Sequence, residues 1–334
     1  MADEIPVLDL APLLAGDAGA LQELGAALRR AFTEVGFYTI RNHGVPERLV
    51  EAVFAEAERF HAQPLEAKLA LKFDRHNTGY LPMRGATTRM NALGTIYKPN
   101  ANEAVFFKRD LPADHPDVLA GLRFRNAQRW PDLPGFRAVV VEYCNAMEAL
   151  AKRLLPLYAI ALGLPRDWFA DKFREPMYTL RMTHYPQQDA TTPEDEWGLA
   201  PHADTSFMTI LAQNRIPGLS VQLPDGRWVD APAPAGTFQV NGGMMLRRWS
   251  NDRFLATPHR VVNRSGRERY AIPFFLDCDY RTVMEPLPSC VDADHPAKYP
   301  PFTYPEFMSE YASRNYAERE AGRQGKGEVQ LQGA

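Results

Sequence analysis

The sequence predicts a protein of mixed α and β class whose second half forms a jelly roll or a barrel. From residue 176 onward, the apolar residues change from helical to alternating spacing. Short segments of this kind follow one another at nearly regular intervals, separated by turns such as residues 224–226 and 264–266. The 22 Gly and 28 Pro among 334 residues also favour many short strands over a bundle of helices.

The first hundred residues combine strands and helices. Pro6 is compatible with a strand only at the edge of a sheet, so the segment around it is expected to be an edge strand. Asp17 is a residue type that caps helices, and Gly36 can end the helix that follows. The elements expected here are a strand at residues 5–10, a helix at 17–35, a strand at 37–40 and a helix at 47–61.

One long helix should precede the strands of the second half. Residues 136–163 repeat apolar residues at helical spacing, and Pro156 should kink this helix. The expected strands are residues 177–185, 207–213, 219–223, 237–241, 259–263 and 270–276. A helix at 303–319 and a polar, disordered tail beyond residue 322 should complete the chain.

Composition and charge exclude several classes of protein. With 45% apolar and 24% charged residues, the chain can bury a core and is not globally disordered. The net charge is −3 and no block of Lys or Arg occurs, so a nucleic-acid partner is not expected. There is no run of about 18 apolar residues and no export signal at the first residues. Three dispersed cysteines do not form a disulfide framework, and we expect a cytoplasmic protein without a membrane anchor.

His202 and Asp204 are candidate ligands of one metal ion. Residues i and i+2 of an extended chain point to the same face, so an imidazole and a carboxylate lie side by side there. His259 begins another predicted strand, and a jelly roll can bring distant strands together. Two His and one carboxylate leave three positions of an iron ion open, whereas zinc more usually takes a closed or three-His set. The alternative is that both histidines only satisfy buried hydrogen bonds.

The remaining histidines are given ordinary roles. The surface is expected to hold His61, His76, His115 and His295. His43 lies in a predicted turn, where local hydrogen bonding is expected, and His184 lies within a predicted strand, where packing is expected.

Arg269 and Tyr185 are candidate binding residues for an anion. Arg269 opens an apolar strand, and it lies either at the rim or inside, where a buried charge needs a partner. A dicarboxylic co-substrate bound to the iron at one end would offer its other carboxylate to this guanidinium. Tyr185 ends another strand and could add a phenolic donor, although core packing also accounts for it.

These residues and the segments around them resemble the iron(II)- and 2-oxoglutarate-dependent oxygenases of the isopenicillin N synthase-like family. The segments that carry the resemblance are residues 5–10, 35–45, 202–211, 218–222, 226–230, 254–261 and 269–274. The resemblance implies a double-stranded β-helix (jelly roll) core with flanking helices and an N-terminal α/β region. It also implies that His202, Asp204 and His259 ligate Fe(II), and that Arg269 and Tyr185 contact 2-oxoglutarate.

The resemblance also implies an activity and a domain organisation. Such an enzyme takes O₂, converts 2-oxoglutarate to succinate and CO₂, and oxidises, by default hydroxylates, a C–H bond of a small molecule. The expected regions are an N-terminal dioxygenase-type region at 1–110, a helical segment at 111–175, the jelly-roll core at 176–280 and a C-terminal helix with its tail at 281–334.

Three positions depart from the pattern of this family. Ala271 stands where the family commonly has Ser, so one hydrogen bond to the co-substrate is missing, worth about 1–3 kcal/mol if its acceptor stays unpaired. Met244 replaces an acidic residue, and Thr183 stands where many relatives have Asn. None of the three is an expected iron ligand.

Two other functions remain open from the sequence. An oxidase of the isopenicillin N synthase type would use the same three ligands and O₂ without 2-oxoglutarate. A non-catalytic protein on the same scaffold would bind a small molecule only. The sequence does not identify the primary substrate or the oligomeric state.

Residues 75–109 are expected to form a lid at the mouth of the pocket, because they lack periodicity in a long segment. Arg181 and residues 244–248 should lie beside them. Four basic residues of the segment indicate an acidic substrate or are merely solvated: Arg75, Arg84, Arg89 and Lys98.

Overall fold

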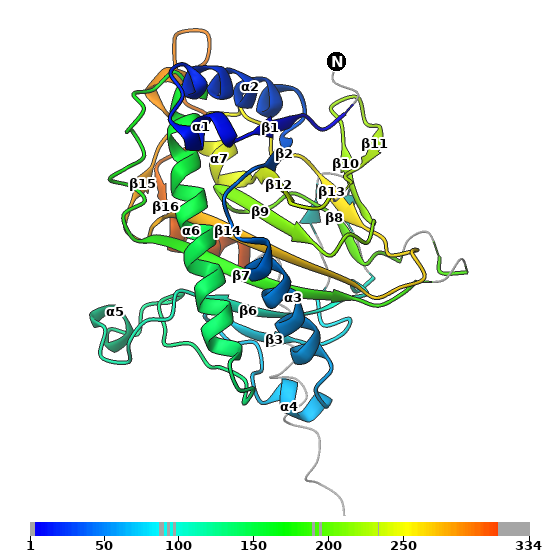
Figure 1. The fold of residues 1–334 in the computed structure, drawn as a ribbon. Helices are drawn as coiled ribbons and strands as arrows, with labels where there is room; N and C mark the ends of the chain where they lie inside the picture. The colour runs from blue at the N-terminus through cyan, green and yellow to red at the C-terminus, as the bar shows by residue number, and fades with distance from the viewer. Residues whose placement is uncertain are drawn as a thin grey trace, which may run out of the picture.

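The computed structural model of the chain describes residues 4–312, except residues 87–89, 92–93, 96–97, 189–190, 194–195 and 233. Two sheets of different size dominate it (Figure 1). The larger sheet has eight strands in the order β1-β2-β12-β9-β14-β7-β6-β3. Its strands are β1 Val7–Asp9, β2 Phe37–Arg41, β3 Gly79–Leu81, β6 Glu103–Lys108, β7 Pro176–Tyr185, β9 Met208–Gln213, β12 Thr237–Gly242 and β14 Arg269–Asp279.

The smaller sheet has the order β11-β10-β13-β8, and all its pairings are antiparallel. Its strands are β8 Leu199–His202, β10 Leu219–Gln222, β11 Trp228–Asp230 and β13 His259–Val261. Two short ribbons pair β4 Met90–Asn91 with β5 Gly94–Thr95 and β15 Val283–Met284 with β16 Phe302–Thr303.

Helices cover the face of the large sheet that points away from the small sheet. In Figure 1, α6 and α3 run along this face, and both contact β14. The helices are α1 Ala11–Ala15, α2 Ala20–Glu34, α3 Glu47–His61, α4 Leu65–Leu69, α5 Pro116–Leu119, α6 Phe136–Ala161 and α7 Met244–Trp249, with a 3-10 turn at Pro288–Cys290. Residues 304–312 are also helical.

Two apolar cores follow from this layering. The larger one fills the space between the helices and the large sheet, where residues such as Phe32, Met147 and Ile272 are fully buried. The smaller one lies between the two sheets and joins Tyr185 and Ala271 of the large sheet to Leu219 and Val261 of the small sheet. Two facing sheets, antiparallel except for the parallel pair β1 and β2, with an apolar layer between them form the predicted jelly roll.

Most elements expected from the sequence are confirmed. The helix α3 has the expected bounds, and the six expected strands of the second half are present as β7, β9, β10, β12, β13 and β14. The start of α2 was placed too early, because residue 17 precedes a turn and Gly19 takes the N-cap position. Residues beyond 312, including the end of the last expected helix and the expected disordered tail, lie outside the described residues.

The expectation of an irregular segment at 75–109 is wrong for β3 and β6. The strand β6 pairs with both β3 and β7 within the large sheet. Its apolar centre is flanked by Glu103 and Lys108, and charged ends are not typical of a buried strand. Both are nevertheless buried, because each finds partners inside the protein; Lys108 Nζ donates to Thr179 Oγ1 and Tyr304 Oη.

The three cysteines, Cys144, Cys278 and Cys290, are free and buried, in agreement with the absence of a disulfide framework. Among the described residues, no helix combines the length and the apolar character that crossing a membrane requires.

Candidate active site

The three predicted metal ligands converge between the two sheets. His202 ends β8 and His259 begins β13, and these two residues are direct partners in the antiparallel pairing of the strands. Asp204 follows two residues after His202. Its Oδ1 atom lies 3.6 Å from His202 Nε2 and 3.7 Å from His259 Nε2. Strand pairing therefore explains how a histidine distant in sequence reaches the His-x-Asp segment.

Hydrogen bonds fix the orientation of all three side chains. The Nδ1 atom of His202 donates to the Ala200 carbonyl over 2.9 Å, and that of His259 donates to the Thr257 carbonyl over 3.2 Å. A carbonyl can only accept, so the Nε2 atoms keep their lone pairs for a metal ion. Asp204 Oδ2 accepts hydrogen bonds from Thr209 Oγ1 and Asn241 Nδ2, at 2.7 and 2.8 Å. Its Oδ1 atom is thereby left facing the two imidazoles.

Electrostatics keep Asp204 and His259 in the protonation states that metal binding needs. Burial alone would raise the pKa of Asp204, but His259, His202 and the hydrogen bond from Asn241 outweigh it and hold that pKa well below its usual range. Burial, reinforced by the nearby His202, lowers the pKa of His259 to about 4. At neutral pH the group thus offers a carboxylate and a neutral His259 imidazole.

Arg269 lies inside the protein rather than at its rim. The side chain begins β14, is 0% exposed and has its guanidinium 4.9 Å from the centre of the Tyr185 ring. Its Nε and Nη2 atoms donate to the Ile216 carbonyl and to Gln213 Oε1, at 3.2 and 2.6 Å. The Nη1 atom is buried and has no partner among the described residues. A buried cation with a free donor is a site for an anion.

A narrow cavity joins these groups. Its wall includes the three candidate ligands together with Arg269 and Tyr185, and Arg181, Ala271 and Asn241 also line it. Apolar side chains, among them Phe37 and Leu211, form much of the remainder. Larger hollows of about 480 and 850 Å³ lie elsewhere and include none of the candidate ligands. The candidate metal ligands and the candidate co-substrate residues therefore all line the smaller, inner cavity.

The donor set fits an Fe(II) ion. Two imidazole nitrogens and one carboxylate oxygen face the same cavity, and the second atom of each group is already occupied by an internal partner. Such a set covers one side of a six-coordinate ion and leaves positions toward the cavity.

The expected mouth of the pocket is described only in part, because residues 87–89, 92–93 and 96–97 lie outside the described residues. Of the residues assigned to it, Arg181 lines the cavity, and residues 244–248 do not. The start of α7 instead holds the backbone of Asp204, because the Met244 N–H donates to the Asp204 carbonyl. In α7, Arg248 packs against Phe307. The cations of the expected lid that are described, Arg75, Arg84 and Lys98, are exposed and line none of the cavity, and Arg89 lies outside the described residues.

Thr209 and Asn241 are functional residues that the sequence did not reveal. They hold Asp204 from β9 and β12, two strands that pair with each other. The signal for Asn241 was its place in the Asn-Gly-Gly-Met stretch, which was read only as having lost an acidic residue.

The histidines outside the candidate site differ partly from expectation. His43 accepts a hydrogen bond from the Val45 N–H, which confirms its local role in the turn. The expectation of a surface position is wrong for His61, which is 6% exposed because it lies on the buried face of α3. His184 is not simply packed, since it forms ion pairs with Glu103 and Glu268.

Comparison with known families agrees with this geometry. Residues 5–133 match the family described as non-haem dioxygenase in morphine synthesis N-terminal. Residues 176–277 match the 2OG-Fe(II) oxygenase superfamily. The second match spans all three candidate metal ligands and both candidate co-substrate residues.

Individual relatives cover nearly the whole chain. The 2-oxoglutarate-Fe(II) type oxidoreductase hxnY of Emericella nidulans is 34% identical, over 95% of this chain and 91% of the relative. A full-length Neurospora crassa protein solved in complex with alpha-KG has a similar structure, with a TM-score of 0.82 and 25% identity over 94% of this chain and 98% of the other. The complex of the same protein with alpha-KG and thymine gives a TM-score of 0.81 at 25% identity, covering 94% and 99%.

The extent of these matches, and the two-His, one-carboxylate group found between the sheets, lead to one conclusion. The chain belongs to the 2-oxoglutarate- and iron(II)-dependent oxygenases, and it is an oxidoreductase that uses Fe(II), 2-oxoglutarate and O₂.

Proposed function

We propose that this oxygenase oxidises a C–H bond of a small-molecule substrate in the cavity between the two sheets. His202, Asp204 and His259 hold the Fe(II) ion, and Arg269 and Tyr185 hold the distal carboxylate of 2-oxoglutarate. The observation that carries the proposal is the convergence of two Nε2 atoms on Asp204 Oδ1 in a cavity that also contains a buried, incompletely paired arginine.

Each part of the site then has a defined task. Iron supplies the activation of O₂, coupled to the conversion of 2-oxoglutarate into succinate and CO₂. Thr209 and Asn241 keep one oxygen of Asp204 turned toward the metal, because they occupy the other. Arg269 fixes the far end of 2-oxoglutarate by charge-assisted hydrogen bonds, and Gln213 and the Ile216 carbonyl hold the guanidinium in place. Apolar walls such as Phe37 and Leu211 exclude water from the reacting groups.

Arg181 is our candidate for recognising the substrate. It lies four residues before Tyr185 on β7, which places it about 13 Å along the strand from the level of Arg269. Its guanidinium donates to Asn102 Oδ1 over 3.1 Å, while the Nε atom is buried without a partner among the described residues. A cation at this end of the cavity favours a substrate that carries a carboxylate or another anionic group.

Arg181→Gln should raise the KM for the substrate by about tenfold and leave the KM for 2-oxoglutarate nearly unchanged. The variant loses one charge-assisted contact with the substrate, which is worth roughly 1.4 kcal/mol or more at a half-buried site. Steady-state kinetics with each of the two varied measures both values. The matched control is Arg84→Gln, since Arg84 pairs with Glu196 at the surface, outside the cavity. An equal change in both variants would remove Arg181 from substrate recognition.

Ala271→Ser should tighten 2-oxoglutarate binding by several-fold if no other group replaces the missing hydroxyl. Ala271 lines the cavity one alternation along β14 from Arg269, so a serine hydroxyl there would face the same space. Titration of 2-oxoglutarate into the iron-loaded protein under anaerobic conditions measures the change. An unchanged dissociation constant would indicate that water already supplies the hydrogen bond.

The activity itself is tested by succinate release over a panel of small metabolites. The panel should be weighted toward anionic compounds and run with and without 2-oxoglutarate, with Asp204→Ala as the inactive control. Succinate release that depends on one compound and on iron supports the proposal. Turnover without 2-oxoglutarate would support an oxidase instead, and a protein that binds a panel member without oxidising it would support a binding function.

A further inference from the structure

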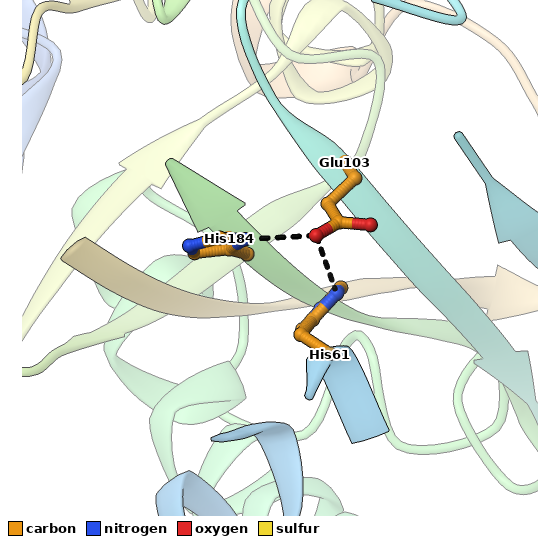
Figure 2. Close-up of side chains that lie close together, drawn as sticks. All are labelled: His61, Glu103 and His184. Atoms are coloured by element: carbon orange, nitrogen blue, oxygen red, sulfur yellow. Dashed lines mark hydrogen bonds and ion pairs between the residues drawn. The ribbon is translucent and has the colours of Figure 1, made fainter. Parts of the chain in front are cut away.

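A second group of two histidines and one carboxylate lies on the other face of the large sheet. His184 is adjacent to Tyr185 on β7, and neighbours in a strand point to opposite faces, so His184 points away from the cavity. Glu103 of β6 is its direct partner across the strands, and His61 reaches both from the last position of α3. Figure 2 shows both imidazoles directed at one carboxylate oxygen of Glu103.

One of the two distances in this group matches those around Asp204, and the other is a hydrogen-bond distance. Glu103 Oε1 lies 2.8 Å from His184 Nδ1 and 3.6 Å from His61 Nδ1. The corresponding separations around Asp204 are 3.6 and 3.7 Å. One ligand atom from each of the three residues lies within 4.8 Å of the others. Ligand bonds of about 2.0–2.2 Å, as zinc forms with nitrogen and oxygen, are compatible with the separations of 2.8 and 3.6 Å from Glu103 Oε1.

The outer contacts are also those of a metal site. His61 Nε2 donates to the Met182 carbonyl over 3.1 Å, and His184 Nε2 donates to the Glu268 carboxylate. Lys68 Nζ, at 2.9 Å, and the Tyr80 hydroxyl both donate to Glu103 Oε2. Each imidazole is thus held through its far nitrogen, and the carboxylate through its far oxygen, as around Asp204.

His61 supplies an independent reason to expect a ligand. Its side chain is 1% exposed, and its Nδ1 atom has no hydrogen-bond partner among the described residues. Because Nε2 carries the proton donated to Met182, the neutral ring turns the lone pair of Nδ1 toward Glu103 Oε1. An unpaired lone pair then faces a carboxylate oxygen in a buried place, and a cation there would bind both atoms in place of the proton that Glu103 Oε1 shares with His184 Nδ1.

We propose that His61 Nδ1, Glu103 Oε1 and His184 Nδ1 form a second metal site, for a divalent transition-metal ion such as Zn²⁺. Binding displaces the proton shared by His184 Nδ1 and Glu103 Oε1, which passes to solvent, and a water completes the coordination. Lys68 and Tyr80 occupy Oε2, so Glu103 binds through one oxygen. An ion here would connect α3 to β6 and β7 and would serve as a structural clamp, separate from the oxidation chemistry.

The site can be tested in full-length, untagged protein that carries His202→Ala and Asp204→Ala, so that the iron ligands do not contribute. After equilibrium dialysis against Zn²⁺, elemental analysis should find about one bound zinc ion per chain. His61→Gln in this background should abolish that binding, because glutamine can keep the donor to Met182 but lacks Nδ1. Glu103→Gln should abolish it too. His43→Gln, at an equally buried histidine outside the group, should leave it unchanged.

Zinc binding that is absent from the background protein, or that survives both His61→Gln and Glu103→Gln, would overturn the proposal. Circular dichroism shows whether each variant is folded. If the variants fail to fold, crystals of the background protein soaked in Zn²⁺ provide the direct test. An anomalous difference peak at the zinc edge should lie between the three named atoms, and a peak elsewhere, or none, would refute the site.

Discussion

Replacing any one of His202, Asp204 or His259 by alanine should reduce turnover by at least about a thousandfold. Each replacement removes one of three ligand atoms that face a shared point, and loss of metal-based stabilisation costs several kcal/mol, at roughly tenfold per 1.4 kcal/mol. Succinate release at saturating Fe(II) and 2-oxoglutarate measures the effect. The fold should persist, because the three side chains line a cavity and are not part of the continuous apolar core.

The matched control is His295→Ala, since the His295 side chain is 68% exposed and pairs only locally with Asp292. This variant should keep full activity, and thermal unfolding should show native-like melting for all four proteins. Activity near the wild-type level in any of the three ligand variants would remove that residue from the metal site.

Arg269→Leu should raise the apparent KM for 2-oxoglutarate by two orders of magnitude or more, with a much smaller effect on the KM for the substrate. Removal of the buried guanidinium should cost about 2–5 kcal/mol of binding free energy, because the carboxylate of 2-oxoglutarate then stays buried and unpaired. Kinetics with 2-oxoglutarate and substrate varied separately give the two values. This pattern is the reverse of the one expected for Arg181→Gln, so the two variants together separate the two ends of the cavity.

Arg267→Leu is the companion control, because Arg267 lies two residues before Arg269 and is exposed. It should leave both KM values unchanged. Unaltered 2-oxoglutarate affinity in Arg269→Leu would favour an oxidase that does not use this co-substrate, with Arg269 serving only to hold Gln213 and the Ile216 carbonyl.

The candidate metal ligands could be predicted because the relevant geometry is local or follows from motifs. The alternation of a strand places His202 and Asp204 on one face, and the resemblance supplies His259. The burial of Arg269 could not be predicted from the residues, since a rim position and an inward position produce the same sequence pattern. Only the pairing of β14 with β7 places it beside Tyr185.

The second group of two histidines and one carboxylate shows where the sequence was misleading. His61 follows charged residues in the chain, which suggested a surface position, but the amphipathic helix α3 turns it toward β7. The expectation of an irregular segment at 75–109 rests on its poor periodicity, and the strand β6 within it buries Glu103 and Lys108, although buried charges are uncommon without partners. Those partners come from residues distant in the chain, such as Tyr304, and no local pattern indicates them.

The placement of Tyr185 and His184 on opposite faces of β7 limits how this strand can be changed in engineered variants. Positions of β7 that face the cavity, such as Arg181, can be varied to reshape the pocket. The positions between them, Met182 and His184, face α3 and can stay unchanged. Insertion or deletion of one residue between Arg181 and His184 would exchange the two faces over part of the strand. The imidazole of His184 would then enter the oxygenase cavity while a pocket residue left it. Substrate range in this enzyme should therefore be altered by substitution along β7, never by a change in its length.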